Sequence, residues 1–72
     1  MEETFGEKLI GYKFNPSLDK DIDIVKKTFA SLIDLVETFP ENTRIRKIIK
    51  DASISACVSA QMLIVKLIVE SK

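Results

Sequence analysis

The side chains that could do chemistry in this sequence are mainly basic, and they gather in its middle. Residues 26–50 hold six bases and three acids, whereas residues 1–25 hold three bases and six acids. Basic side chains in the first turn of a helix oppose its macrodipole, and a bound phosphate would offset that cost. The pattern therefore indicates either a solvated helix face or a site for a small anion. The bases stand at the heads of two predicted helices: Lys26 and Lys27, then Arg44, Arg46, Lys47 and Lys50.

The overall charge narrows the choice of partner. Lysines and arginines number 11, and aspartates and glutamates also number 11, so the formal net charge is zero. Proteins that bind long nucleic acids usually carry a clear excess of positive charge. We therefore expect no DNA or RNA polymer as a partner.

The residues that catalysis and metal binding usually need are scarce. The chain has no histidine and a single cysteine, Cys57, which excludes Ser-His and Cys-His nucleophile pairs and the usual zinc sites. Cys57 is expected to be a small buried apolar residue. Asp19, Asp21 and Asp23 alternate at a predicted helix start, where acidic residues cap and stabilise a helix. The sequence thus predicts a protein that is not an enzyme and has no catalytic residue, metal or cofactor.

Two long helices are expected to position these side chains within a single helical domain, residues 1–72. The first spans residues 15–39: Asn15 or Ser17 can cap it, with Pro16 tolerated in the first turn. Pro40 disfavours helix at Phe39. Along this helix, apolar residues alternate four and three positions apart, as in a heptad seam: Leu18, Ile22, Val25, Phe29, Leu32, Val36 and Phe39.

The second long helix spans residues 43–70, with Asn42 or Thr43 as its cap. Residues 1–14 form a short N-terminal segment or helix, in which Gly6 and Gly11 permit sharp bends. A short connection makes two long helices antiparallel neighbours. The predicted fold is therefore all-α: an antiparallel two-helix hairpin with a short N-terminal element.

The second helix carries apolar residues on two faces, and a helix that is apolar on opposite sides is buried on opposite sides. With one other long helix in the chain, the second face is expected to meet another copy, which gives a helical homo-oligomer. Small residues at i, i+4 and i+8 would permit a close crossing of two such helices; alternatively, they fill crowded space beneath Phe29 and Phe39. One face is Ile45, Ile49, Ala52, Ala56, Ala60, Leu63 and Leu67; the other is Ile54, Val58, Val65 and Ile68.

A membrane segment is disfavoured by length. The uncharged run covers residues 52–65, fourteen residues bounded by Asp51 and Lys66, and a membrane-spanning helix needs about 18 or more apolar residues. The acidic start MEETFGEKLIG lacks the apolar core of a secretory signal. We therefore expect a cytoplasmic protein with no membrane partner.

Three short motifs carry a resemblance to a known family. They are EKLIGYKF, which contains Gly11-Tyr12-Lys13; IDIVKK, which ends in Lys26 and Lys27; and SAQMLIVKLI, in which Lys66 follows Met62 by four residues. In these motifs, which span most of residues 7–69, the chain resembles the small phage proteins of the anti-CBASS sponge family. The resemblance implies a homo-oligomer, a hexamer in that family, in the cytoplasm of a host cell. It also implies sequestration of cyclic oligonucleotide second messengers, cyclic dinucleotides and in some cases trinucleotides, without cleaving them.

The resemblance also implies a set of ligand-binding residues. Tyr12 would stack on a base, which is worth ~1–3 kcal/mol, and Lys13 with Lys26 or Lys27 would neutralise phosphates. Gly11 would let the backbone approach the ligand or adopt a positive φ. Lys66 either faces a second pocket or extends its ammonium to solvent along an apolar stem.

A different class of function remains open from the residues alone. A non-enzymatic helical-hairpin oligomer could bind a partner protein through its heptad face, with Tyr12 as an ordinary docking aromatic. Both functions predict an oligomer, so only ligand binding distinguishes them.

Overall fold

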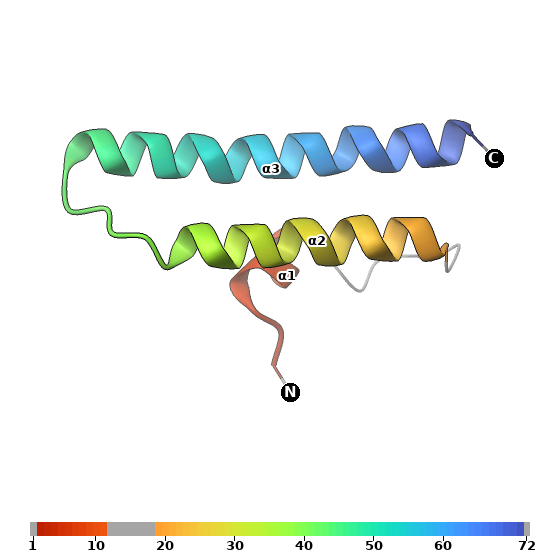
Figure 1. Cartoon of the computed structure of the whole chain (residues 1–72), viewed down its shortest axis with the longest axis horizontal. Coiled ribbons are helices and arrows are strands. Elements are labelled where there is room, and N and C mark those ends of the chain that lie inside the picture. Colours follow the sequence, from red (N-terminus) through yellow and green to blue (C-terminus); the bar gives the residue numbers. More distant parts are fainter. Residues whose placement is uncertain (1, 12–18, 72) are drawn as a thin grey trace.

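The computed structural model describes residues 2–11 and 19–71, and all regular structure in these residues is helical. The helices are α1 (Phe5–Ile10), α2 (Lys20–Glu37) and α3 (Arg44–Glu70). Figure 1 shows α3 running back along α2, while α1 lies against the other side of α2. The all-α class predicted from the sequence is confirmed for the described residues.

The start of α2 differs from the prediction. Asp19 is its N-cap, and the Asp19 carboxylate accepts hydrogen bonds from the backbone N–H groups of Asp21 (2.8 Å) and Ile22 (3.3 Å). The caps predicted at Asn15 or Ser17 were therefore wrong, and both residues lie outside the described part. Asp has as strong a capping preference as Asn or Ser, so the later acidic residue sets the helix start.

The other long-helix ends agree better with the sequence. α2 ends at Glu37, two residues before Phe39, whose position before Pro40 disfavours helical backbone. Thr43 caps α3 by accepting a hydrogen bond from the Arg46 N–H at 3.1 Å. Of the two caps predicted, Asn42 and Thr43, the structure has Thr43. The Asn42 side chain instead accepts a hydrogen bond from the Arg46 guanidinium at 3.0 Å.

The N-terminal element is a short helix closed at both ends. At its start, Thr4 and Glu7 form a capping box, each side chain accepting from the other residue's backbone N–H at 3.2 and 2.9 Å. At its end, Gly11 adopts the left-handed conformation with φ 70°, as predicted for a residue that turns the chain. These two ends let six residues form a helix despite the cost of nucleation.

Gly6 does not make the predicted bend. It lies inside α1, buried against α2, and a Cβ atom there would overlap the backbone oxygen of Ala30. The Gly6 N–H donates to the Asp34 carboxylate at 2.7 Å. Gly6 is therefore a close-approach residue that lets α1 dock on α2.

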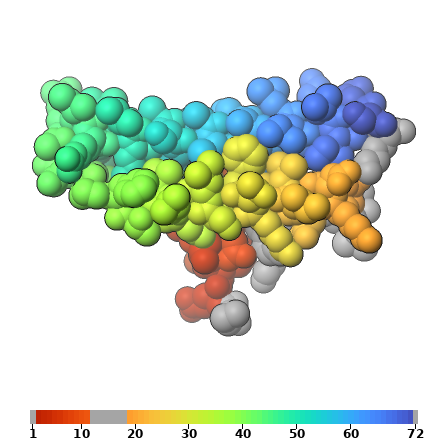
Figure 2. All heavy atoms as spheres, in the orientation of Figure 1, coloured from red at the N-terminus to blue at the C-terminus, as the bar shows by residue number. Residues whose placement is uncertain are grey.

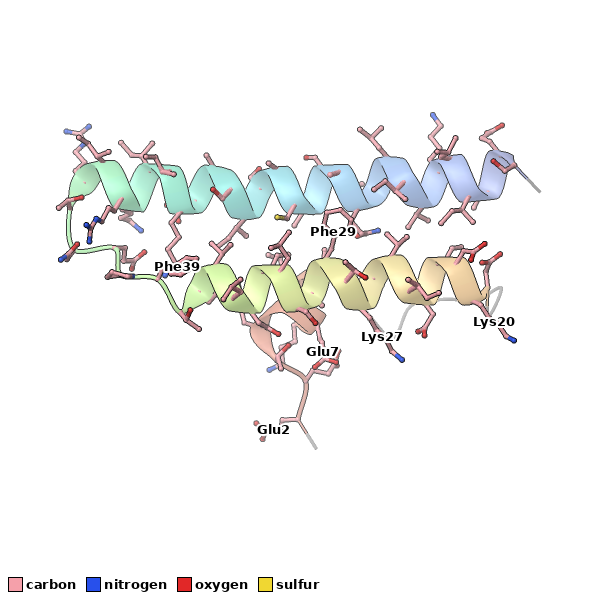
Figure 3. All side chains as sticks on the ribbon, in the orientation of Figure 1. Glu2, Glu7, Lys20, Lys27, Phe29 and Phe39 are labelled. Carbon is pink, nitrogen blue, oxygen red and sulfur yellow. The ribbon has the colours of Figure 1, made fainter. Side chains whose placement is uncertain are left out.

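A small core lies where the three helices meet. Ile10, Ala30 and Ile33 are buried, and Phe29, Ile54, Cys57 and Val58 pack against them. Cys57 is half-buried in this position, which agrees with its predicted packing role. Figure 3 shows Phe29 pointing from α2 toward α3.

The two apolar faces of α3 have different surroundings. Ile54, Val58, Val65 and Ile68 are half-buried, whereas Ala52 and Ala56 are exposed and Ala60 is half-buried. Large side chains of the first face are between 59% and 71% exposed: Ile45, Ile49, Leu63 and Leu67. Because Ala52 and Ala56 are exposed, they do not fill space beneath Phe29 and Phe39. The single chain leaves this face of α3 without a protein partner.

By length and composition, α3 also satisfies a criterion for membrane-spanning helices. An 18-residue window within it has a mean hydropathy of 1.9, and only 6% of that window is buried. The fourteen-residue run predicted from the sequence ended before Lys66. Lys66 is the one charge between Asp51 and Glu70, so a window that includes it remains strongly apolar. Core helices of soluble proteins pass the same test when they are buried.

Candidate ligand-binding site

Two of the residues predicted to bind ligand, Gly11 and Lys26, lie in direct contact. The Lys26 ammonium donates a hydrogen bond to the Gly11 carbonyl oxygen at 3.0 Å, and Lys26 is only 6% exposed. The carbonyl end of a helix carries partial negative charge, so an ammonium there is stabilising. Lys26 therefore joins α2 to the end of α1.

Lys27 lies in a different environment. It is exposed, and its ammonium pairs with the Asp23 carboxylate at 3.3 Å, one turn earlier on α2. Figure 3 shows Lys27 extending from the side of α2 that faces away from α3. The sequence left open whether Lys26 or Lys27 would bind a phosphate. In the structure Lys26 is buried at Gly11, and Lys27 is exposed beside Asp23.

Tyr12 and Lys13 lie outside the described residues, so their predicted roles stay predictions. They follow Gly11 directly in the sequence, and Gly11 is the last described residue before the gap. Lys26 is thus in contact with the residue from which the Tyr12-Lys13 pair continues.

A cleft of about 310 Å³ lies between α1 and α2, and neither Gly11 nor Lys26 is among its lining residues. Its polar groups include the Asp34 carboxylate, which holds the Gly6 N–H, and the Glu7 carboxylate, which caps α1. These carboxylates already serve the structure of α1. The cleft is lined by Thr4, Glu7, Lys27, Ala30, Ser31 and Asp34.

A larger groove of about 450 Å³ lies at the other end of the molecule, where α2 ends and α3 begins. The sequence did not predict it, although the Phe39-Pro40 break and the bases that follow were its visible signals. The Lys50 ammonium donates to the carbonyls of Glu37 (3.1 Å) and Phe39 (3.0 Å) beside it. The groove is lined by Val36, Phe39, Pro40, Arg46, Ile49, Lys50 and Ser53.

Lys66 is exposed on α3 and lines neither of these two hollows. Within residues 2–11 and 19–71, no group of three His, Cys, Asp or Glu side chains could hold a metal ion. The Lys26 ammonium supplies the positive charge at its contact with Gly11.

Comparison with known protein families, with curated proteins and with solved structures found no match. The resemblance to the anti-CBASS sponge family consequently rests on the three sequence motifs alone.

Proposed function

We propose that this protein binds and sequesters cyclic oligonucleotide second messengers without cleaving them, as a phage-type protein for immune evasion in a host cytoplasm. The ligand class is cyclic dinucleotides, and cyclic trinucleotides if Lys66 faces a second pocket. The observation that carries the proposal is the contact between Lys26 and Gly11 at 3.0 Å. It joins two residues, fifteen apart in the sequence, that the motifs nominate independently for one site.

The proposed mechanism uses charge and stacking. A phosphate oxygen is a stronger acceptor for the Lys26 ammonium than a neutral carbonyl is, because the two opposite full charges also attract each other. A phosphate that approaches Gly11 can therefore share or replace the bond to the Lys26 ammonium. Tyr12 would supply the stacking surface and Lys13 a second positive charge. Lys27 contributes less, because the Asp23 carboxylate at 3.3 Å already neutralises it.

The proposed working form is a homo-oligomer, a hexamer by the family resemblance, built from helical hairpins of α2 and α3. Support comes from the exposed face of α3, where four large apolar side chains are between 59% and 71% exposed; contiguous apolar patches of this kind mark interaction sites. Ala56→Leu would overpack a close helix crossing at a cost of ~1–3 kcal/mol and should lower the assembled mass measured by light scattering. A wild-type mass equal to the 8.1 kDa chain at micromolar concentration would contradict the assembly.

Ligand binding is tested by thermal unfolding against a panel of cyclic di- and trinucleotides. A ligand at 100 times its dissociation constant adds ~2.7 kcal/mol, which raises the Tm of so small a domain by about 10–20 °C. Linear dinucleotides of the same bases serve as the matched control. The bound ligand should be recovered intact after the protein is denatured, and recovery of a cleaved product would rule out sequestration.

The second candidate is a non-enzymatic helical oligomer that binds a partner protein. The exposed apolar side chains of α2 favour it, namely Ile24 (60%), Leu32 (42%) and Leu35 (52%). Absence of any thermal shift with the nucleotide panel, in a protein that still assembles, would favour this candidate. Recovery of the protein in a membrane pellet would instead assign α3 to a bilayer.

A further inference from the structure

The groove between α2 and α3 combines an apolar floor with a basic rim. Its floor includes Val36, Phe39 and Ile49, and Phe39 remains 54% exposed. Its basic lining residues are Arg46 and Lys50. They belong to residues 41–50, which contain four bases and one acid, a net charge of +3. Its volume of about 450 Å³ is in the range of pockets that bury an anchoring group. The groove therefore suits an acidic segment that carries an exposed aromatic side chain.

The N-terminal residues have the matching chemistry. Residues 2–8 contain three acids and one base, a net charge of −2, and Phe5 at the start of α1 is 50% exposed. Figure 2 shows this part of the chain projecting from the body of the molecule. Figure 3 shows Glu2 at its far end. An aromatic residue flanked by carboxylates is thus presented to the outside.

This N-terminal element does not reach the groove of its own chain. The contact of Gly6 with Ala30 and Asp34 fixes α1 on one side of α2. Phe39 lies at the opposite side, next to α3 (Figure 3). No residue of α1 is among the residues that line the groove.

We infer that the groove holds α1 of a second copy, with Phe5 on the apolar floor and the N-terminal carboxylates beside Arg46, which lines the groove. Charge complementarity supports this choice of occupant, because the same chain carries an acidic N-terminal segment, residues 2–8 with a net charge of −2, and a basic segment, residues 41–50 with a net charge of +3. It also gives a role to the bases in the first turns of α3: they compensate the carboxylates of a neighbouring copy. Aromatic anchors of this kind dominate the binding energy of interfaces.

The inference rests on the proposed self-association and specifies one of its contacts. A contact between α1 of one copy and the groove of another is heterologous, and such contacts form rings or filaments. A crossing of two exposed α3 faces uses the same surface twice and is isologous. A heterologous contact and an isologous contact together can close an assembly.

The experiment compares the assembled mass of four variants by light scattering. Phe5→Ser removes the anchor, and Phe39→Glu places an acid on the groove floor. Each should weaken association by about 25-fold, the loss typical of an interface hot spot. Leu9→Ser on α1 and Leu35→Glu on α2 are matched controls at exposed positions, 41% and 52%, and should keep the wild-type mass. Circular dichroism checks that helicity is unchanged.

Mixing the two variants distinguishes a heterologous contact from a general loss of association. The Phe39→Glu protein keeps an intact α1 and the Phe5→Ser protein keeps an intact groove, so the mixture should form larger species than either variant alone. If Phe5→Ser loses helicity, Glu2→Lys replaces it in the same mixing test, since Glu2 is exposed.

Three results would overturn the inference. They are wild-type mass in both variants, equal losses in the matched controls, and no gain on mixing. If Ala56→Leu still lowers the mass in the first case, the proposed assembly stands without this contact. A monomeric wild type would overturn both.

Discussion

The two junctions between helices share one kind of contact, a lysine ammonium that donates to backbone carbonyls, in different surroundings. At the first, the Lys26 ammonium of α2 donates to the Gly11 carbonyl at the end of α1. At the second, the Lys50 ammonium of α3 donates to the carbonyls of Glu37 and Phe39 at the end of α2. In both cases a lysine of the following helix compensates the negative end of the preceding one.

The two junctions differ in how closely their residues are packed. Lys26 lies beneath a docked helix and is 6% exposed, and the close approach of Gly6 holds that helix in place. Lys50, whose side chain is 12% exposed and lies 4.0 Å from the Glu41 carboxylate, borders an open groove. The same kind of ammonium–carbonyl contact thus occurs once in a buried position and once beside an open groove.

The largest predicted effect is at the first junction, where Gly6→Ala should release α1. The added Cβ would meet backbone, which cannot rotate away, and overpacking of this kind costs ~1–3 kcal/mol or more. We expect a loss of ~3 kcal/mol in urea unfolding. Gly11→Ala is the control: it meets open space, so only its positive φ is strained, at ~1–2 kcal/mol. Equal losses would show that α1 does not dock as described.

The second-largest effect is a difference in unfolding free energy between substitutions at Lys26 and at Lys27. Lys26→Met removes the ammonium that donates to the Gly11 carbonyl in a buried position and should cost ~1–3 kcal/mol of unfolding free energy. Lys27→Met removes only an exposed i,i+4 pair with Asp23, worth ~0.3–0.5 kcal/mol. Denaturant titration of the two variants measures the difference, and a larger loss in Lys27→Met would reverse the assignment of the buried lysine.

The smallest effect is expected at the second junction. Lys50→Met frees two carbonyls that water can reach, so the unfolding free energy should fall by ~0.5–1.5 kcal/mol. Hydrogen exchange at the end of α2 should rise while that of α1 stays constant. A loss larger than that of Lys26→Met would mean that the second junction is the more tightly packed one.

Local signals in the sequence predicted several parts of this fold. The Pro40 break, the Thr43 cap and the turn at Gly11 depend on neighbouring residues, and all three are present. The two apolar faces of α3 followed from helical periodicity. Such features depend on a few residues in a row, which is why the chain alone reveals them.

Features that depend on distant residues could not be predicted. Gly6 was predicted to bend the chain. Its actual role, a close contact with Ala30, joins segments far apart in the sequence and has no local signal. Lys26 and Lys27 are adjacent in sequence, and only the position of α1 distinguishes them. The groove forms from the ends of two helices, so no single sequence motif predicts it.

The most direct test of sequestration is calorimetric titration of the intact protein with a cyclic dinucleotide, comparing wild type with Tyr12→Phe and Tyr12→Ala. Tyr12→Phe keeps the aromatic face and should bind within about threefold of wild type. Tyr12→Ala should lose ~1–3 kcal/mol of stacking, a drop in affinity of about 5- to 150-fold, with the assembled mass unchanged. Full affinity in Tyr12→Ala, or no binding by the wild type, would contradict the account.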